Sequence, residues 1–94
     1  MITDIKKRLN HRSKIIEGQF KALQQAIDDE AYCMDILTQN LAIQKSLASL
    51  NKLVLENHLR THITDMLQDG SSDSQTKAVD ELLQLYELNN IRGK

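Results

Sequence analysis

The amino-acid sequence predicts an all-α protein, a three-helix protomer with a long central helix. The 94 residues include no proline and only three glycines, so little in the chain interrupts helical hydrogen bonding. Leucine, alanine, glutamine, lysine and acidic residues dominate, a composition typical of helices. Apolar residues also recur at steps of three and four. We expect a single domain over residues 1–94, which is short enough that an oligomer would usually supply further burial.

The first predicted helix covers about residues 3–27. Its apolar positions form one stripe, made of Ile5, Leu9, Ile16, Phe20, Leu23 and Ile27. A second, basic stripe contains Lys7, His11, Lys14, Gly18 and Lys21. Glycine inside a helix costs roughly 1 kcal/mol relative to alanine, which suggests a close helix crossing at Gly18.

The long central helix is expected over about residues 31–67. The acidic segment 28–30 suits its first turn, because carboxylates cap free N–H groups and oppose the helix dipole. Its apolar face is too broad for one short neighbour, so several helices should surround it. A loop over 68–74 precedes the third helix, expected over about 74–90, and Ser72 and Gln75 have capping-box spacing there.

The central helix carries a cysteine and two histidines on one face. Cys33 and His58 are 25 residues apart, which at about 100° per residue is close to seven full turns. His62 lies one turn further along the same stripe. The rise along the helix nevertheless separates Cys33 from His58 by roughly 37 Å, so they cannot meet within one straight helix.

Two antiparallel copies of the central helix would bring these residues together. Each end of such a dimer would join Cys33 of one chain to His58 and His62 of the other, and two-fold symmetry would give two identical sites. One thiolate and two imidazoles suit Cu(I), Zn(II), Ni(II) or Co(II). The alternative is that Cys33 is a small buried hydrophobe and that the histidines are ordinary surface residues.

Charge is distributed unevenly along the chain. Residues 1–21 hold six basic and two acidic side chains, whereas residues 61–94 hold three basic and six acidic ones. A basic end of this kind can face a polyanion such as DNA. The candidate DNA-binding residues are Lys7, Arg8, Arg12, Lys14 and Lys45. The alternative is a solvated face, and no helix-turn-helix or zinc-finger pattern is evident.

Several classes of protein are disfavoured by the sequence. There is no phosphate-binding glycine loop and no catalytic triad, so we do not expect an enzyme. There is no apolar run of membrane-spanning length and no signal peptide, and one cysteine cannot form an intramolecular disulfide. We therefore expect a cytoplasmic protein with no membrane partner and no protein substrate.

Three segments resemble the copper-sensing operon repressor family, which also has nickel/cobalt- and formaldehyde-responsive branches. They are residues 12–19 (RSKIIEGQ), 32–39 (YCMDILTQ) and 56–62 (ENHLRTH), in the order and spacing of that family. The resemblance implies a bacterial repressor that binds operator DNA as apo-protein. It also implies an antiparallel dimer that assembles into a disc-shaped homotetramer.

The resemblance further implies roles for individual residues. It matches Cys33, His58 and His62 to the family's metal ligands. It matches Tyr32 to a tyrosine that, with an acid from the third helix, supports the copper site. Asp80 and Glu81 are the two candidates for that acid.

The chemical identity of the inducer is not decided by the resemblance. Copper sensors often have cysteine where this chain has His62, and imidazole broadens metal selectivity. Nickel/cobalt sensors have an additional N-terminal histidine, and formaldehyde sensors a processed N-terminal proline, whereas this chain begins Met1-Ile2-Thr3-Asp4. We therefore expect Cu(I), with Ni(II), Co(II) or Zn(II) as alternative metals. A formaldehyde-responsive repressor and a purely structural helical oligomer also stay open.

Overall fold

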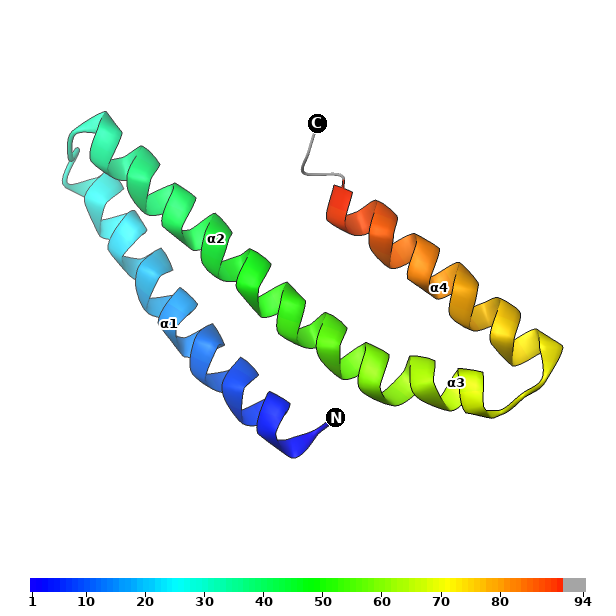
Figure 1. The fold of residues 1–94 in the computed structure, drawn as a ribbon. Helices are drawn as coiled ribbons and strands as arrows, with labels where there is room; N and C mark the ends of the chain where they lie inside the picture. The colour runs from blue at the N-terminus through cyan, green and yellow to red at the C-terminus, as the bar shows by residue number, and fades with distance from the viewer. Residues whose placement is uncertain (91–94) are drawn as a thin grey trace. The chain divides into compact units, whose positions relative to one another are not determined.

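The computed structural model describes the backbone of residues 1–90 and the side chains of residues 1–88. Every regular element within that part of the chain is helical, so the all-α prediction is confirmed. The helical stretches cover residues 3–28, 33–68 and 72–90 (Figure 1). The chain divides into two compact units, Met1–Asn57 and His58–Lys94. Within the described residues, no helix combines the length and apolar character needed to cross a membrane.

Helix α1, Thr3–Asp28, ends in a turn that contains a left-handed residue. The N–H of Glu30 donates to the carbonyl of Ile27 at 3.0 Å, and the N–H of Ala31 donates to that of Ala26 at 2.9 Å. This pair of bonds places Glu30 at a φ of 52°, where glycine is usually found because it lacks a Cβ. The turn therefore reverses the chain at the cost of a strained glutamate.

Helix α2, Cys33–His58, runs antiparallel beside α1 (Figure 1). The backbone N–H of Ile2 donates to Oδ1 of the buried Asn57 at 2.9 Å. Nη1 of Arg12 donates to the carbonyl oxygen of Ser49 at 3.2 Å and also to its hydroxyl. These bonds fix the register of the two helices within the first unit.

The close crossing expected at Gly18 does not occur within one chain. Among the residues that the structure describes, no heavy atom beyond its own helix backbone and neighbours lies within 4 Å of a Cβ built on Gly18. Within the part of the chain that the structure describes, this position is therefore open space.

The central helical stretch changes type after α2. A π-helical turn, η1, covers Leu59–Ile63 and is followed by α3, Thr64–Gln68. The sequence predicted a single helix over about 31–67 with no interruption, and α-helical periodicity gives no warning of a wider turn. In a π turn each hydrogen bond spans five residues instead of four. The side chains of residues 59–63 are therefore turned differently from those of an α-helix.

Helix α4, Ser72–Asn90, is capped by Ser71, so the capping box expected at Ser72 is wrong by one residue. The N–H of Ser74 donates to the Ser71 hydroxyl at 3.1 Å. The hydroxyls of Ser71 and Ser74 each donate to Asp69 Oδ2 at 2.7 Å. These bonds hold the pKa of Asp69 below its ordinary value of 3.8, because they favour the ionised carboxylate. The bond from Ser71 contributes most to this lowering, and the bond from Ser74 comes next.

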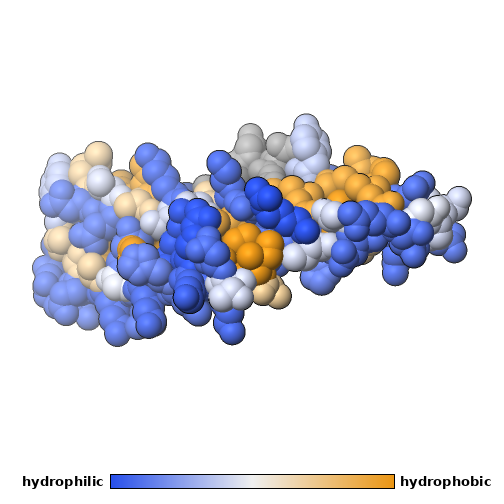
Figure 2. Space-filling view, turned by 60° about the horizontal axis from the view of Figure 1, so that its bottom comes forward, coloured by the Kyte–Doolittle hydropathy of each residue, from blue (hydrophilic) through white to orange (hydrophobic). Residues whose placement is uncertain are grey.

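The core of one chain is small. The buried apolar side chains among the described residues are Ile5, Ala26, Ile43, Leu53, Ile63 and Ala78. Large apolar side chains also stay exposed at helical spacing, among them Met34, Leu37 and Leu41 on α2, and Val79, Leu82, Leu83 and Tyr86 on α4. Figure 2 shows that apolar residues lie at the surface between hydrophilic ones. Exposed apolar surface of this kind marks a surface that another molecule covers.

Candidate functional site

Cys33 occupies the first position of α2. It is a free and exposed thiol. The carbonyl oxygen of Tyr32 accepts hydrogen bonds from the N–H groups of Asp35, at 2.9 Å, and Ile36, at 3.3 Å, so Tyr32 begins the helix with its backbone. The Tyr32 side chain is 72% exposed. The N-terminal end of a helix favours negative charge, which suits a thiolate ligand at Cys33.

His58, the last residue of α2, is bonded to α4. Its Nε2 lies 2.7 Å from Oε1 of Glu81, and both side chains are about two-thirds buried or more, with 27% and 32% exposed. An ionised carboxylate can only accept hydrogen bonds, so Nε2 carries the proton that is shared. In the neutral ring Nδ1 then keeps a lone pair, which is the electron pair that a metal ion requires.

His62 lies within the π turn and close to His58. The centroids of the two rings are 5.1 Å apart, and their planes are tilted by 38°. Two imidazoles on neighbouring tetrahedral positions of one ion, with metal–nitrogen distances of about 2 Å, have centroids about 5 Å apart. The ring separation therefore fits a shared metal ion.

The three predicted ligands are divided between the two units. Cys33 belongs to the first unit, and His58 and His62 belong to the second. Among the described residues of a single chain, no group of three or more cysteine, histidine or acidic side chains is close enough to hold a metal ion.

The two candidate acids of the third predicted helix point to different surroundings. Glu81 contacts His58, as described above. Asp80 instead lines an open pocket of about 300 Å³ together with Ser72, Gln75, Thr76 and Val79. Adjacent positions on a helix are about 100° apart, which explains why only one of them faces the histidine.

The predicted DNA-binding residues of α1 border a basic pocket. Lys7, Arg8, His11 and Arg12 line an open space of about 350 Å³. Arg8 lies 4.0 Å from Asp4 in an exposed ion pair. Arg12 is half-buried by its bonds to Ser49, a structural role that was not predicted because nothing in the apolar or basic pattern of residues 3–27 marks it. The remaining two candidates, Lys14 on α1 and Lys45 on α2, are exposed.

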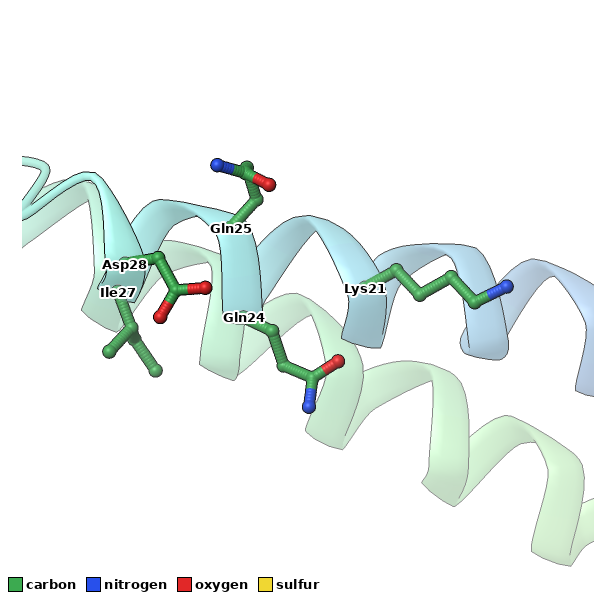
Figure 3. Close-up of a pocket in the computed structure, with 5 residues that line it drawn as sticks. All are labelled: Lys21, Gln24, Gln25, Ile27 and Asp28. Carbon is green, nitrogen blue, oxygen red and sulfur yellow. The ribbon is translucent and has the colours of Figure 1, made fainter.

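Another pocket lies near the end of α1 and has no chemistry of this kind. It measures about 470 Å³ and is lined by Lys21, Gln24, Gln25, Ile27 and Asp28. Figure 3 shows that these five side chains come from one helix and that Gln24 and Gln25 point to different sides of it. A wall built from one helix does not enclose a ligand, so we assign no site there.

Known proteins resemble this chain over most of its length. The family model described as "Metal-sensitive transcriptional repressor" matches residues 5–87. The copper-sensing transcriptional repressor CsoR of Mycobacterium ulcerans is 33% identical over 82 residues, covering 87% of this chain and 68% of that protein. CsoR of Bacillus subtilis is 31% identical over 81 residues, covering 86% and 77%. The crystal structure of the copper-sensing repressor CsoR with Cu(I) from Geobacillus thermodenitrificans matches with a TM-score of 0.75 and 26% identity, covering 93% of this chain and 91% of that one.

Proposed function

Because the chain belongs to the family of metal-sensitive transcriptional repressors, we propose that it is a repressor that binds operator DNA as apo-protein and releases it on binding Cu(I). The relatives described above are named as copper sensors. The observation that carries the proposal is the pair of histidines 5.1 Å apart, one of them held by Glu81.

The proposed ligands are Cys33 of one protomer and the partner's His58 and His62. The angular argument along the central helix supports an antiparallel pairing, since one chain separates Cys33 from the histidines by far more than a metal–ligand distance. Sulfur and imidazole nitrogen are donors that suit Cu(I), which as a bound ion would link two subunits through their helices. Two equivalent sites per dimer follow from two-fold symmetry.

Glu81 is the acid that we assign to the support of this site. By accepting the Nε2–H of His58 it fixes the ring orientation and leaves Nδ1 as the nitrogen that would bind the ion. A carboxylate behind the imidazole also raises its basicity as a ligand. Tyr32, directly before Cys33, is the second supporting residue of the proposal.

The proposed DNA surface consists of Lys7, Arg8, Arg12, Lys14 and Lys45. Neutralisation of phosphates should dominate its affinity and make binding steeply dependent on salt. The pocket bordered by three of these side chains and by His11 has the positive character that a phosphate requires. Metal must bind the DNA-free form more tightly, and by linkage DNA must weaken metal binding by the same factor.

The proposed assembly is a homotetramer made of two antiparallel dimers. The apolar side chains left exposed on α2 and α4 support further copies of the chain as the covering partner. The chain then acts as a single repressor domain over residues 1–94 in a cytoplasmic setting, where a free thiol stays reduced.

Mixed dimers test the proposed site. Cys33→Ala and the double variant His58→Ala/His62→Ala should each lose Cu(I) binding alone. A heterodimer of the two unites both defects at one end and leaves an intact site at the other, so mixing should restore one site per heterodimer. If heterodimers form and bind no more copper than either parent, the antiparallel site is wrong.

The same titrations separate the competing functions. Ni(II), Co(II) and Zn(II) are compared with Cu(I) by competition, because His62 adds an imidazole that these ions also accept. A formaldehyde sensor would instead gain mass at Cys33 on exposure to low formaldehyde. If the protein is a purely structural oligomer, neither the wild type nor the variants should bind metal.

A further inference from the structure

Two threonine hydroxyls donate to backbone carbonyls at different distances along the chain, in agreement with the type of helix around each. In α2 the hydroxyl of Thr38 donates to the carbonyl oxygen of Met34, four residues earlier, at 2.7 Å. After the π turn the hydroxyl of Thr64 donates to the carbonyl oxygen of Leu59, five residues earlier, at 2.8 Å. The same side chain thus reaches one residue further back at Thr64. This side-chain contact matches the π-helical backbone of Leu59–Ile63.

The wider turn changes the angle between the two histidines. In an α-helix four residues advance about 400°, so the second side chain lies about 40° past the first. In a π turn each hydrogen bond spans five residues instead of four, so each residue advances by a smaller angle and four residues fall short of a full turn. In an α-helix His62 would lie slightly past the direction of His58 around the helix axis. In the π turn it lies slightly short of that direction. The observed result is the pair of rings 5.1 Å apart.

We propose that Thr64 is a positioning residue for the metal site: its hydroxyl holds the π turn, and the π turn sets the relative orientation of His58 and His62. The inference rests on the proposed function, because it concerns the same two ligands. Thr64 itself contributes no donor to the ion. Single π turns inside helices occur frequently at functional sites, since they redirect one side chain without ending the helix.

Leu59 and Ile63 show why the backbone needs such a hold. Ile63 is buried, whereas Leu59 is 36% exposed, so one end of the turn is anchored by packing and the other is more open to solvent. The Thr64 hydroxyl binds the carbonyl at the open end. Without it that carbonyl can turn to water, and the ring pair loses its fixed separation.

The test uses three variants and Co(II) as the probe metal. Thr64→Val keeps the side-chain shape and removes the donor, Thr64→Ser keeps the donor, and Thr38→Val removes the matched α-helical bond as the control. In the metal-free proteins, amide hydrogen exchange over residues 59–64 should quicken only in Thr64→Val. Co(II) affinity should fall about fivefold in Thr64→Val, the effect of one hydrogen bond, with a changed visible spectrum. Thr64→Ser and Thr38→Val should match wild type in both measurements.

The outcomes separate this inference from the proposed function. If wild type binds Co(II) and Thr64→Val has the same affinity and spectrum, Thr64 does not position the ligands. If wild type binds no metal, the proposed function itself has failed. If Thr64→Val unfolds, Thr64→Ser decides: a wild-type spectrum supports the role of the hydroxyl, and an altered spectrum contradicts it.

Discussion

His58 Nε2 lies 2.7 Å from Glu81 Oε1, so a hydrogen bond joins the last residue of α2 to α4. The bond is made by a ring nitrogen that donates and a carboxylate oxygen that accepts. It orients the imidazole before any metal arrives. The free-energy cost of ordering this proposed ligand is therefore met during folding, which would favour metal binding.

Replacing Glu81 by glutamine should weaken Cu(I) binding by about 10- to 100-fold, the usual effect of removing support behind a histidine ligand. Glutamine keeps an acceptor oxygen but loses the negative charge that raises the basicity of His58. The measurement is competition with a Cu(I) chelator of known affinity. Asp80→Asn is the matched control and should stay at wild-type affinity, because Asp80 lines a different surface of α4. A larger loss in Asp80→Asn would reverse the assignment of the acid.

The sequence predicts the positions of some candidate site residues better than those of others. Cys33 and His58 are marked by residue type and by a 100° repeat, which holds as long as the helix is α-helical. The repeat fails at residues 59–63, since the hydrogen-bond spacing of a π turn leaves no mark in the apolar pattern. The angle between His58 and His62 could therefore not be derived from spacing.

Three local features show the same limit. Ser71 and Ser72 are chemically equal caps, so only the chain geometry decides between them. Asp80 and Glu81 are both acidic, and the phase of a helix after a loop is not determined by the loop's composition. Glu30 adopts a left-handed conformation, although glycine or asparagine is the residue type that usually predicts one.

Replacing Glu30 by glycine should stabilise the protein. A left-handed conformation costs a residue with a Cβ roughly 1–2 kcal/mol, and glycine's greater freedom in the unfolded chain offsets part of the gain. We expect about 1 kcal/mol in the free energy of unfolding, measured by denaturant titration at fixed protein concentration. Glu30→Gln keeps the strain and removes the charge, so it should gain much less. Equal gains in both variants would trace the effect to crowding with Asp28 and Asp29.

The loop before α4 should weaken in acid. Because the folded state lowers the pKa of Asp69, the unfolded chain takes up the proton first as the pH falls. The stabilisation is complete above the ordinary value of 3.8 and is lost as the pH falls through the lowered folded value. Ser71→Ala should flatten this dependence, seen as a smaller difference between denaturant midpoints at neutral and strongly acidic pH. Ser72→Ala, which removes a neighbouring hydroxyl, should keep the wild-type difference.

Replacing Lys14 should weaken DNA binding alone, whereas replacing Arg12 should weaken both DNA binding and the stability of the fold. Lys14 is exposed, so Lys14→Ala should weaken DNA binding, reduce the salt slope by about one unit and leave stability unchanged. Arg12→Ala should also lower the free energy of unfolding by about 1 kcal/mol, because its bonds to Ser49 are lost. Fluorescence anisotropy on an operator obtained by selection from random duplexes gives the slopes. Lys77→Ala on α4 is the control, and an equal loss there would indicate unspecific attraction by total charge.

Tyr32→Phe should separate metal binding from the release of DNA. The backbone carbonyl of Tyr32 begins α2 and is kept in the variant, while the exposed phenol contributes no ligand, so Cu(I) affinity should stay within about twofold of wild type. The phenol lies next to Cys33 in the chain. In the proposed dimer it could contact the partner's helices, and that contact could differ between the DNA-bound and DNA-free states. Couplings between two such sites are typically about 1–3 kcal/mol, and we expect the variant to lose a measurable share of this energy. Operator affinity is measured by anisotropy with and without Cu(I) for both proteins, and the ratio of the two affinities gives the coupling. If Tyr32→Phe responds to copper as wild type does, the coupling runs through other contacts, of which the bond between His58 and Glu81 is the next to be tested.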